Sequence, residues 1–137
     1  MTSVPGITYI GMIQCSSLAA HLESKSLAGM NASVSSGITE VEFIGVPECS
    51  VSTEYDNNGY SSKVTLKFVS EMDIPLSFPL AFVIKDVSGQ GFLIGKKEKC
   101  YPVIKKDRDT GTPASVKAAF SYQIEYVALV GLIKVSI

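Results

Sequence analysis

The sequence predicts an all-β fold, an antiparallel β-sandwich or barrel of about eight strands. Two observations predict it. Several segments alternate apolar and polar residues with a period of two, and clusters of Gly, Asn, Asp and Pro separate these segments. A chain of 137 residues is long enough to bury a core without disulfides or metals. Because no repeat or low-complexity linker divides it, we expect a single β domain over residues 1–137.

The N-terminal part combines two predicted strands with the one segment that has helical periodicity. Thr8–Ile13 and Thr39–Ile44 are short runs of the β type. Between them, Ser17–Glu23 places two leucines four residues apart behind a candidate N-cap serine, which favours a short helix. We expect the Ser16–Ser36 stretch to be a loop that contains this helix. A connection of ~20 residues is long for a compact domain and is often functional.

The clearest predicted strand is Lys63–Val69. Its apolar residues Val64, Leu66 and Phe68 fall on one face, and its lysines and threonine fall on the other. The same alternation returns in Phe120–Tyr126. Both segments are typical of antiparallel strands with one face in water.

Shorter apolar runs complete the set of strands. Leu80–Ile84 and Phe92–Ile94 are joined through a stretch with Asp and Gly residues, which predicts a β-hairpin. Val103–Lys105 and Leu132–Ile137 are the remaining predicted strands.

The charge is nearly balanced overall but is unevenly distributed. The formal net charge is −1, and Arg108 is the single arginine. We therefore expect no nucleic-acid binding, which requires clustered basic residues. Residues 1–75 hold eight acids and three lysines, a balance of −5, whereas residues 76–137 hold nine bases and five acids, a balance of +4. Opposite charge on two surfaces of one molecule favours head-to-tail self-association.

The cysteines and the apolar runs indicate where in the cell the protein is located. Cys15, Cys49 and Cys100 are odd in number and widely spaced, so we expect free thiols in a reducing compartment. No basic segment precedes an apolar run at the N-terminus, and no apolar run approaches the ~20 residues of a membrane span. We expect a cytoplasmic protein without membrane association, in which the sequon at Asn31–Ser33 is a chance match.

Two motifs resemble ligand sites but lack the required spacing. Gly89–Lys96 is no dinucleotide fingerprint because Gly95 arrives one residue late, and no phosphate-binding loop because no Ser or Thr follows the lysine. Asp107–Gly111 begins like a calcium loop, but Ala118 occupies the position of the bidentate glutamate. We expect two turns, with no cofactor and no metal.

The sequence offers no catalytic constellation. His21 is the single histidine, so a catalytic triad or a histidine metal cluster would depend on this residue alone. Glu40 and Glu42 alternate on a predicted wet face, where they need no catalytic explanation. We predict that the chain is not an enzyme. A Cys–His pair built on His21 is the alternative that stays open.

A basic cluster is the sharpest charge feature. It is either a solvated hairpin end or a docking patch for an acidic protein surface or a phosphate backbone. In a head-to-tail assembly it would lie near acids of the next subunit. The candidate interaction residues are Lys96, Lys97, Lys99, Lys105, Lys106 and Arg108, and the acids expected to face them are Glu40, Glu42, Glu48 and Glu54.

Three segments carry a family resemblance. Phe82–Gly95, Tyr101–Ile104 and Tyr122–Tyr126 together resemble small β proteins encoded among the tail or head-to-tail connector genes of prophages. The resemblance assigns no functional residue. It implies a subunit that repeats in a ring or tube, works by contact alone and is found in the cytoplasm or the virion.

Two functions of different class follow. The first is a non-enzymatic structural or assembly protein, of phage tail or connector type, that forms homo-oligomers and contacts other assembly proteins. The alternative is a ligand-binding β-barrel or sandwich module, with a pocket lined by Tyr and Phe and the Ser16–Ser36 loop as a lid. A charged content of only 18% favours the first, because the centre of an interface is depleted of charge.

Overall fold

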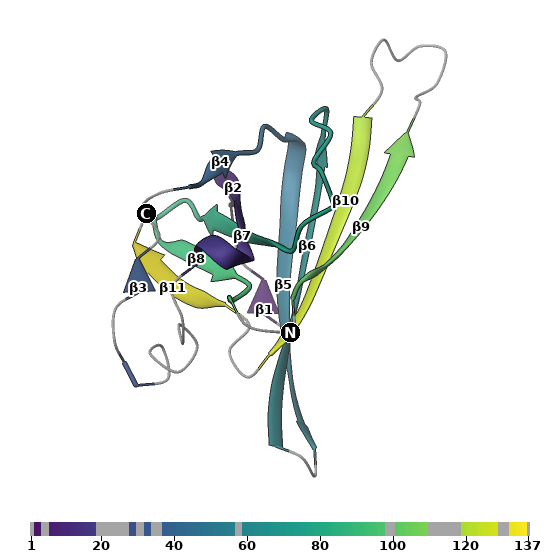
Figure 1. Ribbon diagram of the computed structural model, residues 1–137. Helices are drawn as coiled ribbons and strands as arrows, with labels where there is room; N and C mark the ends of the chain where they lie inside the picture. The colour runs from purple at the N-terminus through teal and green to yellow at the C-terminus, as the bar shows by residue number, and fades with distance from the viewer. Residues whose placement is uncertain are drawn as a thin grey trace.

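The computed structural model describes residues 2–3, 6–18, 28–29, 32–33, 37–56, 59–97, 101–109, 119–128 and 132–136. These residues form two β-sheets that pack face to face as a sandwich. The strands of one sheet run crosswise to those of the other (Figure 1). The predicted all-β, predominantly antiparallel fold is confirmed, and its architecture is the sandwich.

Sheet A contains the longest strands, and all its neighbours are antiparallel. β10 (Ala119–Ala128) pairs with β6 (Gly59–Ser70) only as far as Ser62, whereas the pairing of β5 (Ile44–Asp56) with β6 continues to Asp56 and Gly59. The part beyond this point, Glu54–Asp56 with Gly59–Ser61, is called the arm, and it projects from the sandwich (Figure 1). The order of sheet A is β1 (Thr2–Ser3), β5 (Ile44–Asp56), β6 (Gly59–Ser70), β10 (Ala119–Ala128) and β9 (Val103–Asp109).

Sheet B is built from shorter strands. Its pairs are antiparallel except for the parallel pair of β3 and β11. A single-turn 3-10 helix, η1 (Cys15–Ser17), follows β2. The order of sheet B is β3 (Ala32–Ser33), β11 (Ile133–Ser136), β8 (Gly91–Ile94), β7 (Leu80–Lys85), β2 (Tyr9–Gln14) and β4 (Thr39–Glu40).

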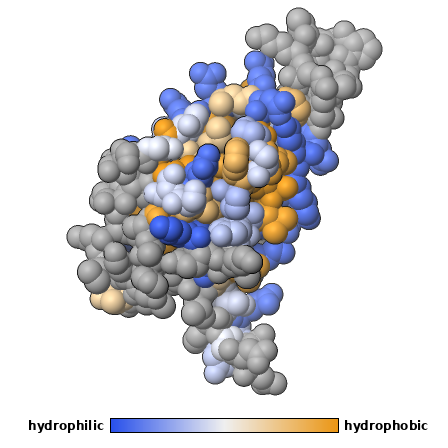
Figure 2. Space-filling model, viewed as in Figure 1, coloured by the Kyte–Doolittle hydropathy of each residue, from blue (hydrophilic) through white to orange (hydrophobic). Residues whose placement is uncertain are grey.

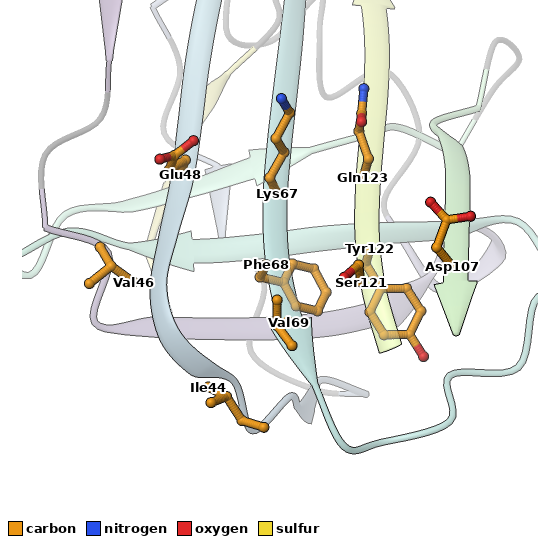
Figure 3. A pocket seen from close by; sticks show the side chains of 10 residues that line it. All are labelled: Ile44, Val46, Glu48, Lys67, Phe68, Val69, Asp107, Ser121, Tyr122 and Gln123. Atoms are coloured by element: carbon orange, nitrogen blue, oxygen red, sulfur yellow. The ribbon is translucent and has the colours of Figure 1, made fainter. Parts of the chain in front are cut away.

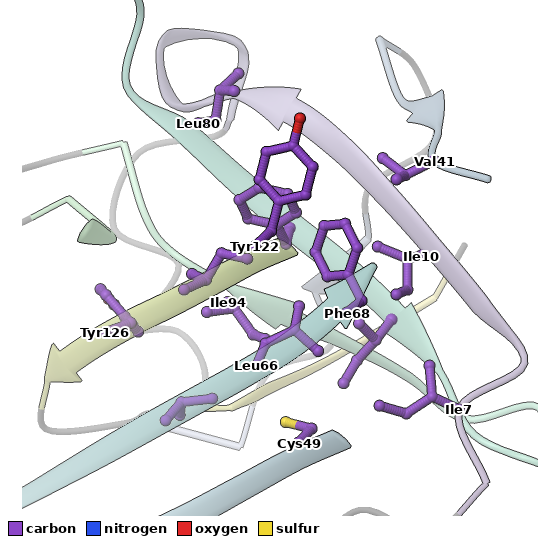
Figure 4. Close-up of a cluster of buried hydrophobic side chains, with 14 of the residues drawn as sticks. Ile7, Ile10, Val41, Cys49, Leu66, Phe68, Leu80, Ile94, Tyr122 and Tyr126 are labelled. Carbon is purple, nitrogen blue, oxygen red and sulfur yellow. The ribbon is translucent and has the colours of Figure 1, made fainter. Parts of the chain in front are cut away.

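β7 is buried on both faces, so its sequence is a continuous apolar run instead of an alternating one. Phe82 and Ile84 belong to the main core between the sheets, part of which Figure 4 shows. Ala81 and Val83 point the other way, because successive side chains of a strand alternate between faces. They join a second buried cluster on the opposite face of sheet B, made of Ile13, Cys15, Leu18, Leu93, Ile133 and Val135.

Tyr122 ties the two sheets together. Its ring stacks on that of Phe68, with centroids 5.2 Å apart and an interplanar angle of 25°. Its hydroxyl donates a hydrogen bond to the carbonyl of Met72 at 2.7 Å and accepts one from the N–H of Ile74 at 3.0 Å. Met72 and Ile74 lie on the connection from β6 of sheet A to β7 of sheet B. One side chain of sheet A therefore holds the crossover.

The structure corrects the predicted strand Thr39–Ile44. β4 ends at Glu40, the N–H of Val41 bonds to the carbonyl of Ile10 at 2.8 Å, and β5 then begins at Ile44 in the other sheet. This segment is thus a crossing between sheets and not one strand. The other predicted strands are confirmed with different ends.

The predicted helix Ser17–Glu23 is not formed where its beginning is described. Ser17 ends η1, and Leu18 is extended, with φ −80° and ψ 154°. The rest of this helix, and most of the predicted Ser16–Ser36 loop, lies outside the described residues.

The substitution Ile124→Ala is expected to lower the free energy of unfolding by about 2–5 kcal/mol, because this β10 side chain is fully buried and its loss leaves a cavity. Val127→Ala on the same strand is the matched control. Val127 is 54% exposed, and we expect its truncation to cost less than about 0.5 kcal/mol. Urea denaturation followed by circular dichroism measures both, and equal losses would contradict this placement of the core.

Candidate interaction surface

The outer face of sheet A is polar, and its side chains form rows across the strands. Leu66 is fully buried, so its neighbour Lys67 points outward. Strand pairing places Glu48 on one side of Lys67 and Gln123 on the other. Lys105 of β9 completes the row beside Gln123. This row therefore ends in an acid at the β5 edge and in a base at the β9 edge.

β5 contains a bulge where it enters the sheet. Its register against β6 shifts between Ile44 and Glu48, and Gly45 within the bulge has a φ of 75°, which favours glycine. The bulge leaves Val46 86% exposed. Pro47 follows and has no N–H to offer a neighbouring strand. Irregular backbone and a proline thus interrupt this part of the edge.

An open depression of about 280 Å³ lies beside the bulge (Figure 3). Its apolar and aromatic lining comes from Ile44, Val46, Val69, Phe68 and Tyr122, and its charged lining comes from Glu48, Lys67 and Asp107.

Lys105 and Glu125 form the centre of a small polar network on the outer face. The Lys105 Nζ lies 3.5 Å from the Glu125 Oε1, and the Gln123 Nε2 donates to the same oxygen at 2.9 Å. The positive charge of Lys105, followed by the Gln123 hydrogen bond and the charge of Lys63, holds the pKa of Glu125 below its ordinary value. The Lys105 side chain is still 58% exposed, so it can meet a further partner.

Lys106 points to the opposite face of β9. Its Nζ lies 4.4 Å from the centroid of the Phe120 ring and 5.8 Å from that of Tyr122. It also donates to the carboxylate of Asp73, and this hydrogen bond is the main reason that the pKa of Lys106 is raised. Only 20% of the Lys106 side chain is exposed. The residue is therefore used within the molecule.

The structure does not bring the predicted basic cluster together as one patch. Lys96 and Lys97 follow β8 of sheet B, whereas Lys105 and Lys106 lie on opposite faces of β9 in sheet A. The backbone of Arg108 lies on β9, and Lys99 is outside the described residues. Of the described cations, Lys105 is the one on the outer face of the β9 edge.

Sheet A ends in two unlike edges. Among the described residues β9 pairs on one side only, with β10, and its seven residues contain three bases and two acids, a formal charge of +1. At the other edge, the thirteen residues of β5 contain three acids and no base, a formal charge of −3. In the described part of the chain, β1 covers β5 there at Ser50 and Val51. The sequence patterns singled out neither the β5 edge nor its bulge, although Gly45 and Pro47 are signals of a bulge.

A second apolar surface lies on the connection between the sheets. Leu76 is 44% exposed and Phe78 is 52% exposed. Phe78 lines two grooves, of about 280 and 320 Å³. Figure 2 shows hydrophobic side chains at the surface among polar ones on the face in view.

The remaining chemistry of the described residues is limited. Cys15 and Cys49 are free and buried, and burial raises the pKa of each thiol to about 11. No three His, Cys, Asp or Glu side chains in this part of the chain gather as a metal site requires. Nor does any helix there have the length and hydrophobicity to cross a membrane. His21 and Cys100 lie outside the described residues.

Comparisons with known proteins identified no similar protein. No family model, no curated protein and no solved structure matches the chain.

At pH 8 we expect Cys15 and Cys49 of the native protein to react slowly with a disulfide reagent. Thiolates are the reactive form, and a pKa raised to about 11 leaves few of them. At pH values below this pKa, the rate at which the thiols of the native protein react should rise about tenfold per pH unit. Under denaturing, non-reducing conditions all three cysteines of the chain should titrate. A smaller total would show that a disulfide has formed.

The substitution Lys106→Met should lower the free energy of unfolding by about 1 kcal/mol, because it removes the Asp73 ion pair and the contact with the Phe120 ring. Lys105→Met on the exposed face is the control, with an expected change below about 0.5 kcal/mol. Thermal and urea unfolding at one pH compare the two variants. A larger loss from Lys105→Met would contradict these positions.

Proposed function

We propose that this chain is a non-enzymatic structural or assembly protein that forms homo-oligomers by head-to-tail contact. The observation that carries the proposal is that sheet A ends in two unlike edges with opposite formal charge. A molecule with two different complementary surfaces makes heterologous contacts, which close into rings or extend into filaments.

Exposed apolar side chains at both edges support the same proposal. Val103 is 58% exposed at the β9 edge. At the β5 edge, Ile44 is 49% and Val46 is 86% exposed. An interface needs apolar contact for affinity, and its surrounding charges mainly speed the encounter and set the orientation. The two edges carry both kinds of group.

The narrower assignment, to the phage tail or connector class, rests on the resemblance carried by Phe82–Gly95, Tyr101–Ile104 and Tyr122–Tyr126. These segments include most of β7, all of β8 and the middle of β10, which are interior strands of the two sheets, and they also include the start of β9. In this proposal the partners are copies of the chain and other assembly proteins, in the cytoplasm or the virion.

A ligand-binding module is the second candidate, and the open depression beside the β5 bulge favours it. However, the aromatic side chains that such a pocket would use are largely packed in the core. Phe68, Phe82 and Tyr122 are 4%, 0% and 2% exposed. A monomer that binds small apolar molecules at the depression would favour this candidate over assembly.

Sedimentation velocity tests the assembly. At high concentration and low salt we expect species larger than the 14.6 kDa monomer. Added salt should reduce their fraction, because the screening length falls from about 10 Å at 0.1 M to about 3 Å at 1 M.

Charge reversal tests the edge. Lys105→Glu should weaken association about tenfold, in the range of a lost interfacial charge contact. Lys134→Glu makes the same change of net charge at an exposed position of β11 in sheet B and should have little effect. A wild-type protein that stays monomeric under all these conditions would end the proposal.

A further inference from the structure

We infer that the contact between copies is a strand pairing, in which β9 of one copy adds to the Ser50–Asp56 edge of β5 in the next copy, in the place that β1 occupies. The inference rests on the proposed head-to-tail assembly and specifies which strands of two copies are in contact. It continues sheet A from one copy into the next and leaves both cores unchanged.

Strand directions in sheet A permit this pairing. From β5 through β6 and β10 to β9, each strand is antiparallel to its neighbour, so β9 runs opposite to β5. A second copy in the same orientation therefore brings its β5 beside β9 as an antiparallel pair, with both outer faces on the same side. β1 runs in the same direction as β9. An incoming β9 would thus meet β1 in parallel, but meets β5 in the antiparallel arrangement of the rest of the sheet.

The position of the bulge limits where β9 can pair. Ser50–Asp56 is the regular part of β5 that faces β6 residue by residue, well clear of Gly45 and Pro47. Its seven residues match the seven residues of β9. Pairing the two stretches end to end places every residue of β9 against regular backbone.

This register also places opposite charges together. It sets Lys105 opposite Glu54, and both side chains are exposed on the outer face. Glu54 has no ion-pair partner within the described part of the chain. The same register sets Asp107 opposite the uncharged Ser52.

Two registers closer to the bulge are less favourable. Moving β9 four residues toward the bulge sets Asp107 opposite Glu48, a like-charge pair that destabilises a sheet. Moving it six residues sets Lys105 opposite Glu48, but lays the second half of β9 over the bulge and Pro47.

β1 is a weak occupant of this edge. Its described residues pair with β5 at two positions, whereas β9 offers seven residues. Each strand pair that forms satisfies backbone groups which an open edge leaves to water. The exchange therefore gains paired backbone, and β1 covers the β5 edge in the isolated subunit.

The arm gains a third strand from the same contact. Beyond Ser62 of β6, the arm consists of two strands, and an isolated two-stranded ribbon is marginally stable in water. Glu54 and Tyr55 of the arm are exposed, Tyr55 by 73%. An added β9 pairs along the β5 side of the arm and extends the sheet over it.

Disulfide cross-linking tests the register. In a Cys100→Ser background, one preparation carries Lys105→Cys and another carries Glu54→Cys. Directly opposed residues of an antiparallel pair have Cβ atoms about 4.5–5.5 Å apart, close to the span of a disulfide, so the mixture should yield about tenfold more covalent dimer than either preparation alone. Circular dichroism before mixing checks that both variants are folded.

The matched control mixes Lys105→Cys with Glu48→Cys, because Glu48 is an exposed acid on the same face of β5. If the control pair cross-links as well as the test pair while the wild type assembles, the inferred register is wrong and the proposed function stands. If the wild type never assembles, the proposed function itself fails. As a second measurement, Glu54→Lys is combined with Lys105→Glu in one chain. This double variant should regain the association that Lys105→Glu alone loses, and failure to regain it counts against the register.

Removal of residues 1–3 tests the displacement of β1. We expect a larger oligomer fraction than the wild type at the same concentration, because the β5 edge is then open. Amide hydrogen exchange in β9 and in Ser50–Asp56 should slow as either protein assembles. An unchanged oligomer fraction, or exchange that stays fast in both segments, overturns the displacement.

Discussion

The burial of β7 on both faces is the constraint on which the rest of the structure depends. One face requires sheet A as a cover, and the side chain of Tyr122 holds the connection that brings the two sheets together. The other face requires its own cover, which Cys15 and Leu18 help to supply. Sheet B therefore buries side chains on both of its faces. In the described part of the chain, sheet A buries only one face, so its outer face and its edges stay accessible.

Strands with a simple environment could be predicted from the sequence. Lys63–Val69 has one wet face and alternates, while Leu80–Ile84 has none and is wholly apolar. β5 could not be predicted in the same way. Its alternation breaks at Gly45–Pro47, and in its arm the neighbouring side chains Glu54 and Tyr55 are both exposed. The alternation of apolar and polar residues reflects which side chains are buried, and few side chains of β5 are buried.

The candidate surface was harder to predict than the fold. Basic residues close in sequence suggested one patch, but a strand sends Lys105 and Lys106 to opposite faces, where one meets water and the other meets aromatic rings. In the proposed assembly, the acids that face them on a neighbouring copy depend on which strands form the sheet edges. Edge identity is a property of sheet order, and sheet order is set by long-range pairing that local patterns do not contain.

The two lysines of β9 have a consequence for how its alignment with β10 is specified. A slip by one residue exchanges the faces of every side chain. Lys105 would then replace Lys106 beside the Phe120 ring, so the ammonium groups barely distinguish the two alignments. Their neighbours do. The slip would turn Asp107 from the outer face to the inner one and Ile104 into water, and both changes are unfavourable. Correct alignment of this edge is thus encoded by one isoleucine and one aspartate, and not by the conspicuous charges between them.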